Sequence, residues 1–110
     1  MANAYKVLGQ VAPSATTATT AYTVPSSTEA VISTIVIANR AASAGTYRIA
    51  VRPNGATLAN EHYLAYDVVI AANDSTALTL GITIDASDVV TVYASSANMS
   101  FNLFGSEITA

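Results

Sequence analysis

Short runs of β-branched and aromatic residues recur along the whole chain, and turn-forming residues separate them. Within the runs apolar and polar positions alternate with a period of two, as in strands, and the i, i+3, i+4 spacing of amphipathic helices is scarce. Pro25, Gly55, Asn73 and Asp85 lie in the separating turns. The pattern predicts about eight strands, at residues 4–10, 20–24, 30–38, 47–52, 62–70, 76–84, 89–94 and 99–104.

The most strongly β-forming part of the chain spans residues 29–51. In its first run, strict alternation places Val31, Ile35 and Ile37 on one face and Ile32 and Val36 on the other. Both faces are therefore largely apolar. This pattern predicts a strand that is covered on both sides, at the centre of a sheet or of an assembly.

The second run, residues 47–52, alternates more cleanly, with Tyr47 on one face and Arg48 and Arg52 on the other. Asp67 lies within a later predicted strand, where a carboxylate must face water, pair with a cation or be covered at an interface. We therefore expect a cross-strand pair between Asp67 and either Arg48 or Arg52. Contact with a partner protein is the alternative interpretation of Asp67.

These elements predict an all-β fold, a single antiparallel β-sandwich or jelly roll. The pattern does not separate a jelly roll from an immunoglobulin-like sandwich, since the two differ in connection order. Residues 11–20 are rich in Ala, Thr and Ser, and Pro13 restricts them to extended backbone. We therefore expect an N-terminal strand and extended arm over residues 1–19, followed by the sandwich domain over residues 20–110. Removal of residues 1–19 is expected to leave the sandwich folded.

Composition adds an expectation of assembly. The 110 residues suffice for one domain with one core. Hydrophobic residues make up 52% of the chain and charged residues only 10%, against about 25% in typical globular domains. Because so few charges protect poorly against association, we expect a homo-oligomer or a larger assembly.

Charge and hydropathy also bear on the partners. The net charge is −3, and the four basic residues are too few for the cationic footprint of a nucleic-acid-binding protein. No apolar run approaches the roughly 20 residues that a membrane span requires. The first ten residues lack the features of a signal peptide, so we expect synthesis in the cytoplasm. Neither nucleic acid nor membrane is an expected partner.

The sequence contains few residues of the types that catalyse reactions or bind metals. The chain has no cysteine and a single histidine, His62, which leaves a zinc site or a nucleophile–base pair short of residues. Most carboxylates fall in turns, and Asp85 with Asp88 does not match the spacing of a calcium loop. We expect no enzyme, no metal and no cofactor.

Tyrosines supply the remaining candidates for function. Tyr47, Tyr63, Tyr66 and Tyr93 fall on predicted strands, where aromatic rings form a sugar platform, anchor an interface or pack in the core. Two of these tyrosines, together with three charged residues on the strands, define a candidate interface. Its members are Tyr47, Arg48, Arg52, Tyr63 and Asp67.

Four segments give the chain a wider resemblance: AYKVLGQVAPSATTATTAYTVP, STIVIANR, YLAYDVVIAANDSTALTLGITI and DVVTVYASSANMSFNLFGSEI. Over nearly its full length the chain resembles small β-rich virion proteins of tailed bacteriophages. The resemblance implies a repeated, non-enzymatic part of the particle, made in the host cytoplasm, whose partners are its own copies and other virion proteins such as the major capsid protein. A capsid decoration (cement) protein is the first expectation, and a tail, neck or baseplate component is the alternative. A receptor- or glycan-binding β-sandwich module at the tail is a further alternative. No functional residue is carried over from the family.

Overall fold

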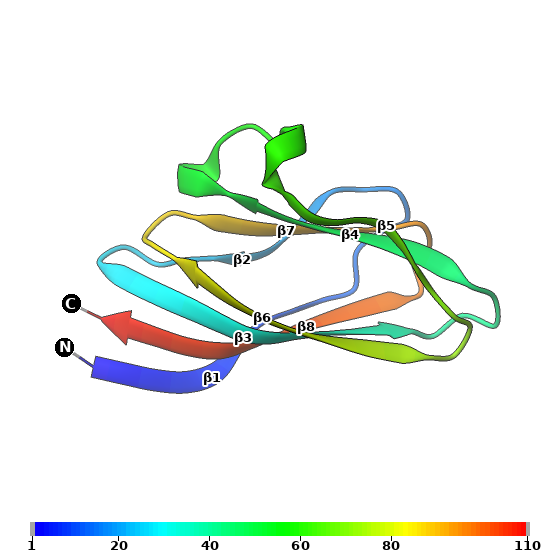
Figure 1. Ribbon diagram of the computed structural model, residues 1–110, viewed down its shortest axis with the longest axis horizontal. Helices are drawn as coiled ribbons and strands as arrows, with labels where there is room; N and C mark the ends of the chain where they lie inside the picture. The colour runs from blue at the N-terminus through cyan, green and yellow to red at the C-terminus, as the bar shows by residue number, and fades with distance from the viewer. Residues whose placement is uncertain (1, 110) are drawn as a thin grey trace.

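The computed structural model describes residues 2–109 as two stacked antiparallel sheets (Figure 1). Within this range the chain forms eight strands, so the predicted number is confirmed. Their bounds are β1 Ala2–Val11, β2 Thr19–Thr23, β3 Thr28–Asn39, β4 Gly45–Arg52, β5 Tyr63–Ile70, β6 Ser75–Ile84, β7 Val89–Ala94 and β8 Met99–Thr109. Two short 3-10 turns, η1 (Pro53–Gly55) and η2 (Asn60–His62), lie in the connection between β4 and β5.

The strands divide equally between the two sheets. Sheet A has the order β1-β8-β3-β6, and sheet B has the order β2-β7-β4-β5. Consecutive strands mostly lie in different sheets, and β4 with β5 is the only sequential pair that is hydrogen-bonded in the described part of the chain. No helix in residues 2–109 is long and apolar enough to cross a membrane. The all-β fold and the two-sheet sandwich are thus confirmed.

The core fills the space between the sheets with fully buried aliphatic and aromatic side chains. Sheet A contributes Ile32, Ile35 and Phe101, all at 0% exposure, and sheet B contributes Ile49. The Tyr47 ring of sheet B meets Phe101 edge-on across the core, with 6.4 Å between ring centroids. Burial of such residues is the main stabilising contribution in a domain of this size.

The strict alternation predicted for β3 is wrong at one point. The pairing of β3 with both β8 and β6 shifts between Ile32 and Thr34, which makes Ser33 a bulge. Ile32 and Ile35 consequently both face the core, although alternation predicts opposite faces for them. β3 does lie inside its sheet, between β8 and β6, and its outward residues such as Val36 are half-buried.

The expected extended arm at the N-terminus is not confirmed. β1 pairs with β8 from Ala2 to Val11 and forms an edge strand of sheet A. The next residues cross to sheet B, where the amide of Thr16 donates to the carbonyl of Ala94 at 2.8 Å. The predicted N-terminal strand is therefore present as an edge strand, and the residues predicted as an arm form the connection to the opposite sheet. A domain boundary at residue 19 stays a prediction.

Candidate interaction surface

Arg48 of β4 lies on the outer face of sheet B between two tyrosine rings. Its guanidinium carbon is 4.1 Å from the ring centroid of Tyr66 and 4.2 Å from that of Tyr93. Its Nε donates to Oδ1 of Asp67 at 2.6 Å and its Nη2 donates to Oδ2 at 3.2 Å. The expected cross-strand pair is thus confirmed for Arg48, in the two-pronged geometry that suits a guanidinium. We call Arg48, Tyr63, Tyr66, Asp67 and Tyr93 the arginine–tyrosine cluster.

A bulge in β5 brings these side chains together. The pairing of β4 with β5 shifts at this point, so that both Tyr66 and Asp67 lie opposite Arg48. Asp67 has φ 51°, in the left-handed region that Asp tolerates better than most residues. The Tyr66 ring in turn meets the Tyr63 ring edge-on, with 4.9 Å between centroids. One irregular strand therefore presents two tyrosines and a carboxylate to the same arginine.

The ion pair keeps both partners charged. The hydrogen bond from Arg48 holds the pKa of the Asp67 carboxyl below its usual range, against a smaller opposing effect of burial. The same hydrogen bond raises the pKa of Arg48. Since both pKa values move away from neutrality, Arg48 and Asp67 both stay charged at neutral pH, and their opposite charges leave the cluster with no net charge.

A hollow of about 280 Å³ lies between this cluster and the connection that follows β4. Tyr63, Tyr93 and Leu58 give it apolar walls, and Thr16 and Thr91 add hydroxyls. Its volume is just below the roughly 300–1,000 Å³ of typical small-molecule sites. The hollow can hold one small group against a tyrosine ring.

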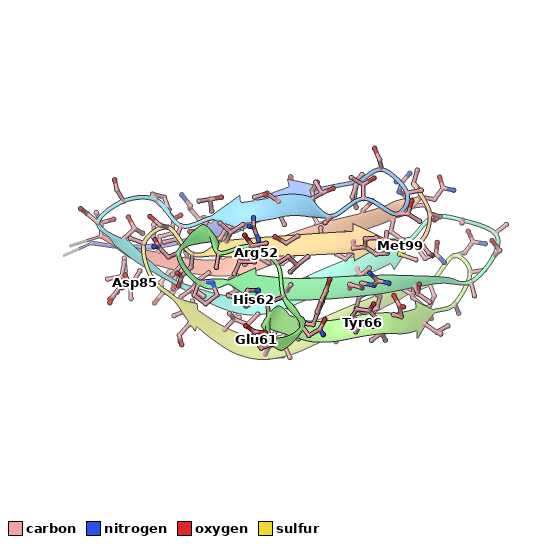
Figure 2. The ribbon with its side chains drawn as sticks, turned by 90° about the horizontal axis from the view of Figure 1, so that it is seen from above. Arg52, Glu61, His62, Tyr66, Asp85 and Met99 are labelled. Atoms are coloured by element: carbon pink, nitrogen blue, oxygen red, sulfur yellow. The ribbon has the colours of Figure 1, made fainter. Side chains whose placement is uncertain are left out.

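The other two members of the predicted interface lie elsewhere. Tyr47 is 2% exposed and belongs to the core, which is one of the roles that the sequence left open for the tyrosines. Arg52 donates from Nε to the Thr91 hydroxyl at 3.0 Å and from Nη1 to the carbonyls of Gly55 and Ala56 at 3.3 and 2.9 Å. Figure 2 labels Arg52 beside this connection, and its bonds to the two carbonyls fasten the connection to sheet B. Arg48, Tyr63 and Asp67 come together, and Tyr47 and Arg52 stand apart from them.

Exposed apolar side chains on the edge strands are a feature that the sequence pattern missed. On β5, Leu64, Val68 and Val69 are 51%, 39% and 69% exposed, and on β1, Tyr5 is 86% exposed. Val68 pairs with the buried Tyr47, but the edge position of β5 leaves it partly open. One signal in the sequence could have indicated exposed apolar residues on β5. Both alternating sets of this strand contain apolar residues, although one of the sets also contains Asp67.

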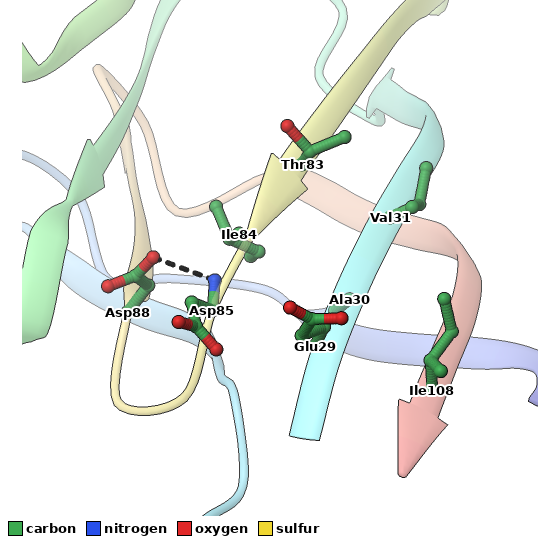
Figure 3. A pocket seen from close by; sticks show the side chains of 8 residues that line it. All are labelled: Glu29, Ala30, Val31, Thr83, Ile84, Asp85, Asp88 and Ile108. Atoms are coloured by element: carbon green, nitrogen blue, oxygen red, sulfur yellow. Dashed lines mark hydrogen bonds between the residues drawn. The ribbon is translucent and has the colours of Figure 1, made fainter. Parts of the chain in front are cut away.

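The residues considered for chemistry serve the backbone. His62 Nδ1 accepts the amide of Ala59 at 3.0 Å inside η2. Asp88 accepts the amides of Asn54 at 2.8 Å and Asp85 at 2.9 Å, and the second of these bonds appears in Figure 3. Among residues 2–109, no three His, Cys, Asp or Glu residues are grouped so as to hold a metal ion. These groups stabilise turns.

A buried polar network closes the opposite edge of the sandwich. Glu107 of β8 is 9% exposed, accepts a hydrogen bond from the Tyr22 hydroxyl of β2 at 2.5 Å, and pairs with Lys6 Nζ of β1 at 2.7 Å. These hydrogen bonds, first that from Lys6 and then that from Tyr22, lower the pKa of Glu107. Burial, followed by the bond to Glu107, raises the pKa of Tyr22. The network ties both sheets together, and nothing in the sequence pattern indicates it.

The fold and the surface together define an antiparallel two-sheet β-sandwich with an arginine–tyrosine cluster on one face and apolar side chains along its edges. No protein-family model, no curated protein and no solved structure matches the chain.

Proposed function

We propose that this chain is a non-enzymatic structural protein of a tailed-bacteriophage virion, and specifically a capsid decoration (cement) protein. The observation that carries the proposal is apolar surface left open in a chain with only 10% charged residues. Tyr5, Val7, Leu64, Tyr66 and Val69 are between 47% and 86% exposed. Free monomers keep such surface small, whereas a subunit of a shell covers it against its neighbours. The resemblance to small virion proteins supports the same function.

We further propose that the sandwich is a jelly roll. The support is its strand order, β1-β8-β3-β6 facing β2-β7-β4-β5. This is the order that a jelly roll produces when one long hairpin of four strand pairs folds across two sheets. The pairs are β1 with β8, β2 with β7, β3 with β6 and β4 with β5. Viral capsid domains and lectins use the jelly roll, which suits a protein that works through its flat faces and edges.

The proposed partners are further copies of the chain and the major capsid protein, and the proposed location is the virion. As a decoration protein, the chain stabilises the shell through multimeric contacts. A place in the tail, neck or baseplate is the alternative, because rings of subunits there use the same flat apolar contacts.

Copy number in purified particles tests the proposal. Quantitative mass spectrometry measures the ratio of this chain to the major capsid protein. A fixed ratio that tracks the capsid subunits, with hundreds of copies in each particle, is the expected result. A few to a few dozen copies would place the chain in the tail, neck or baseplate, and its absence from the particle would overturn the virion proposal.

A matched pair of variants tests whether the exposed apolar edge makes the contact. Val69→Lys places a charge on the open surface of β5, and Thr57→Lys adds the same charge to an exposed position in the connection after β4. We expect Val69→Lys to reduce incorporation into particles and Thr57→Lys to leave it unchanged. Equal incorporation of the two variants would show that this edge is not a contact.

A receptor- or glycan-binding module at the tail is a second candidate, favoured by one observation. Tyr63 and Tyr93 line the 280 Å³ hollow, and Tyr66 packs beside them. Aromatic rings beside a small hollow suit the apolar face of a sugar. If this function is correct, Tyr63→Ala abolishes attachment to cells and leaves assembly intact, while Tyr5→Ala, outside the cluster, affects neither attachment nor folding.

A further inference from the structure

The outer face of sheet A is almost free of charge. Its outward positions carry Tyr5 and Val7 on β1, Phe104 on β8, Val36 on β3 and Thr79 on β6, together with other small or uncharged residues. Lys6 and Glu107 of the same sheet turn inward and pair with each other. Tyr5 and Val7 are 86% and 47% exposed on this face. Such a flat, uncharged face can be covered by another surface without leaving a buried charge unpaired.

Opposite charges mark the two ends of this face. Glu29 is the second residue of β3, where it is exposed and pairs with Ile108 of β8, and it is labelled in Figure 3. Arg40 follows the last residue of β3, and its Nε donates to the outward-facing Ser100 hydroxyl at 2.9 Å. The ion pairs within residues 2–109 are Lys6–Glu107 and Arg48–Asp67, so neither Glu29 nor Arg40 has an ionic partner inside the chain. Eleven residue steps separate the two, about 35 Å along an extended strand.

The charges also oppose the simplest alternative, pairing through the free edge of sheet A. β6 is an uncharged edge strand, but Asp74 precedes its first residue and Asp85 follows its last. Antiparallel pairing of two copies of β6 would bring Asp74 of each copy towards Asp85 of the other. Like charges directly opposite each other on paired strands, about 4.8 Å apart, are destabilising, whereas the same two residues on stacked sheets lie about 10 Å apart. The face of the sheet is therefore a better contact than its edge.

We propose that the outer face of sheet A docks against the same face of a second copy of this chain, around a two-fold axis near Thr34. The axis at this point lies between the two A sheets of the dimer and runs perpendicular to their strands. It therefore stacks β3 of one copy on β3 of the other in opposite directions. Glu29 of each copy then lies over Arg40 of the other, and the uncharged centre of one face covers that of the other. This contact between two copies does not depend on where in a particle the chain is used.

The area available suffices for a stable contact. Four strands spaced about 4.8 Å apart and about ten residues long give a face of roughly 19 by 33 Å, or about 600 Å² in projection. Side-chain relief makes the accessible area larger than the projection. Specific interfaces bury about 800 Å² for each partner, so this face is close to the standard size. In Figure 1 it is the lower surface of the molecule, on the side away from the connection between β4 and β5.

Charge reversal provides the test. Analytical ultracentrifugation of the full chain, from about 1 µM to about 1 mM, measures the dissociation constant of the dimer. Glu29→Arg and Arg40→Glu each set like charges against each other at both ends of the contact, and each should raise this constant about tenfold. The double variant E29R/R40E restores opposite charges and should bring the constant back towards the wild-type value. Glu61→Arg, an exposed position in η2 above sheet B, changes the net charge as Glu29→Arg does and should have no effect.

Thr79→Lys tests the centre of the outer face of sheet A, independently of the charged residues at its two ends. Thr79 is exposed, and it pairs with Thr34 beside the proposed axis, so a charge here should raise the dissociation constant about 100-fold without unfolding the chain. A wild-type chain that stays monomeric at every concentration would overturn the proposal. A dimer that tolerates Thr79→Lys would rule out this face. A dimer that responds to Thr79→Lys but not to charge reversal would rule out the two-fold arrangement.

Discussion

The hydrogen bond from Tyr22 to Glu107 allows a sharp test of what closes the sandwich on the β1–β2 side. The Tyr22 hydroxyl lies 2.5 Å from Oε2 of Glu107, and Lys6 Nζ lies 2.7 Å from Oε1. Because Tyr22 belongs to sheet B and the other two residues to sheet A, this bond joins the sheets. Tyr22→Phe removes the hydroxyl alone and keeps the ring, which is 7% exposed, in place.

The expected loss follows from the chemistry of the bond. A hydrogen bond to a charged group contributes about 1.5–3 kcal/mol, and its removal leaves one carboxylate oxygen of Glu107 buried without that donor. We expect Tyr22→Phe to lower the free energy of unfolding by about 2 kcal/mol. With a urea dependence of roughly 1–2 kcal/mol per molar, the unfolding midpoint falls by about 1–2 M.

Urea unfolding followed by circular dichroism measures this loss. Tyr5→Phe is the matched control, because it removes the same hydroxyl group from a tyrosine that is 86% exposed to solvent. The control should unfold within about 0.5 kcal/mol of wild type. If Tyr22→Phe also unfolded within that margin, the reasoning that this network ties the two sheets together would be refuted.

The pH dependence of stability gives a second measurement on the same group. The pKa of Glu107 is lowered in the folded chain, first by Lys6 and then by Tyr22, so the unfolded chain binds more protons between the two pKa values. The stabilisation is therefore complete above the unfolded pKa of about 4.3 and is lost as the pH falls through the lower folded value. Glu107→Gln should remove this part of the acid dependence, and an unchanged acid profile would contradict the assignment.

Three further variants test local features of the fold. A Cβ on Gly105 would overlap the carbonyl oxygen of Val31, so Gly105→Ala should cost at least about 3 kcal/mol or prevent folding, as thermal unfolding would show. Asn39→Ala removes an amide that lies 3.0–3.3 Å from three backbone carbonyls, and we expect a loss of about 2 kcal/mol in urea unfolding. Arg48→Met removes the donor beside Asp67, so the pKa of that carboxyl should rise towards its ordinary value in a carbon-13 NMR titration.

The sequence predicts the strands well because the alternation of side chains and the turn residues are local signals. It predicts the faces of those strands less well, because bulges depend on pairing between distant segments. At Ser33 the pairing shifts against both neighbouring strands, and the core face changes from one alternating set to the other. Gly81, with φ 63° on β6, and Gly105 on β8 lie close to this shift in the pairing, so the sheet accommodates the bulge across three strands. A bulge that involves three strands cannot be predicted from the residues of any one of them.

Some contacts of the candidate surface could likewise be predicted from the sequence, and others could not. A pair between Asp67 and either Arg48 or Arg52 could be predicted from the sequence, because opposite charges on adjacent strands have few other partners in a chain this poor in charge. The structure selects Arg48. The stacking of Tyr66 and Tyr93 on Arg48 could not be predicted, since the β5 bulge decides which way Tyr66 points. The burial of Glu107 was equally inaccessible, because its partners lie about 85 and 100 residues away in the sequence.

The position of β1 changes what a truncation can reveal about assembly. The sequence predicts that removal of residues 1–19 leaves a folded sandwich, as it would for a free arm. In the structure residues 2–11 pair with β8 and carry Lys6, so their removal would open an edge of sheet A and leave Glu107 without its cation. Poor incorporation of such a truncated chain into particles would then report misfolding as readily as a lost contact. Surface substitutions that keep β1 in place, such as Thr79→Lys and Val69→Lys, separate assembly from folding, and they are the tests on which the proposed interfaces depend.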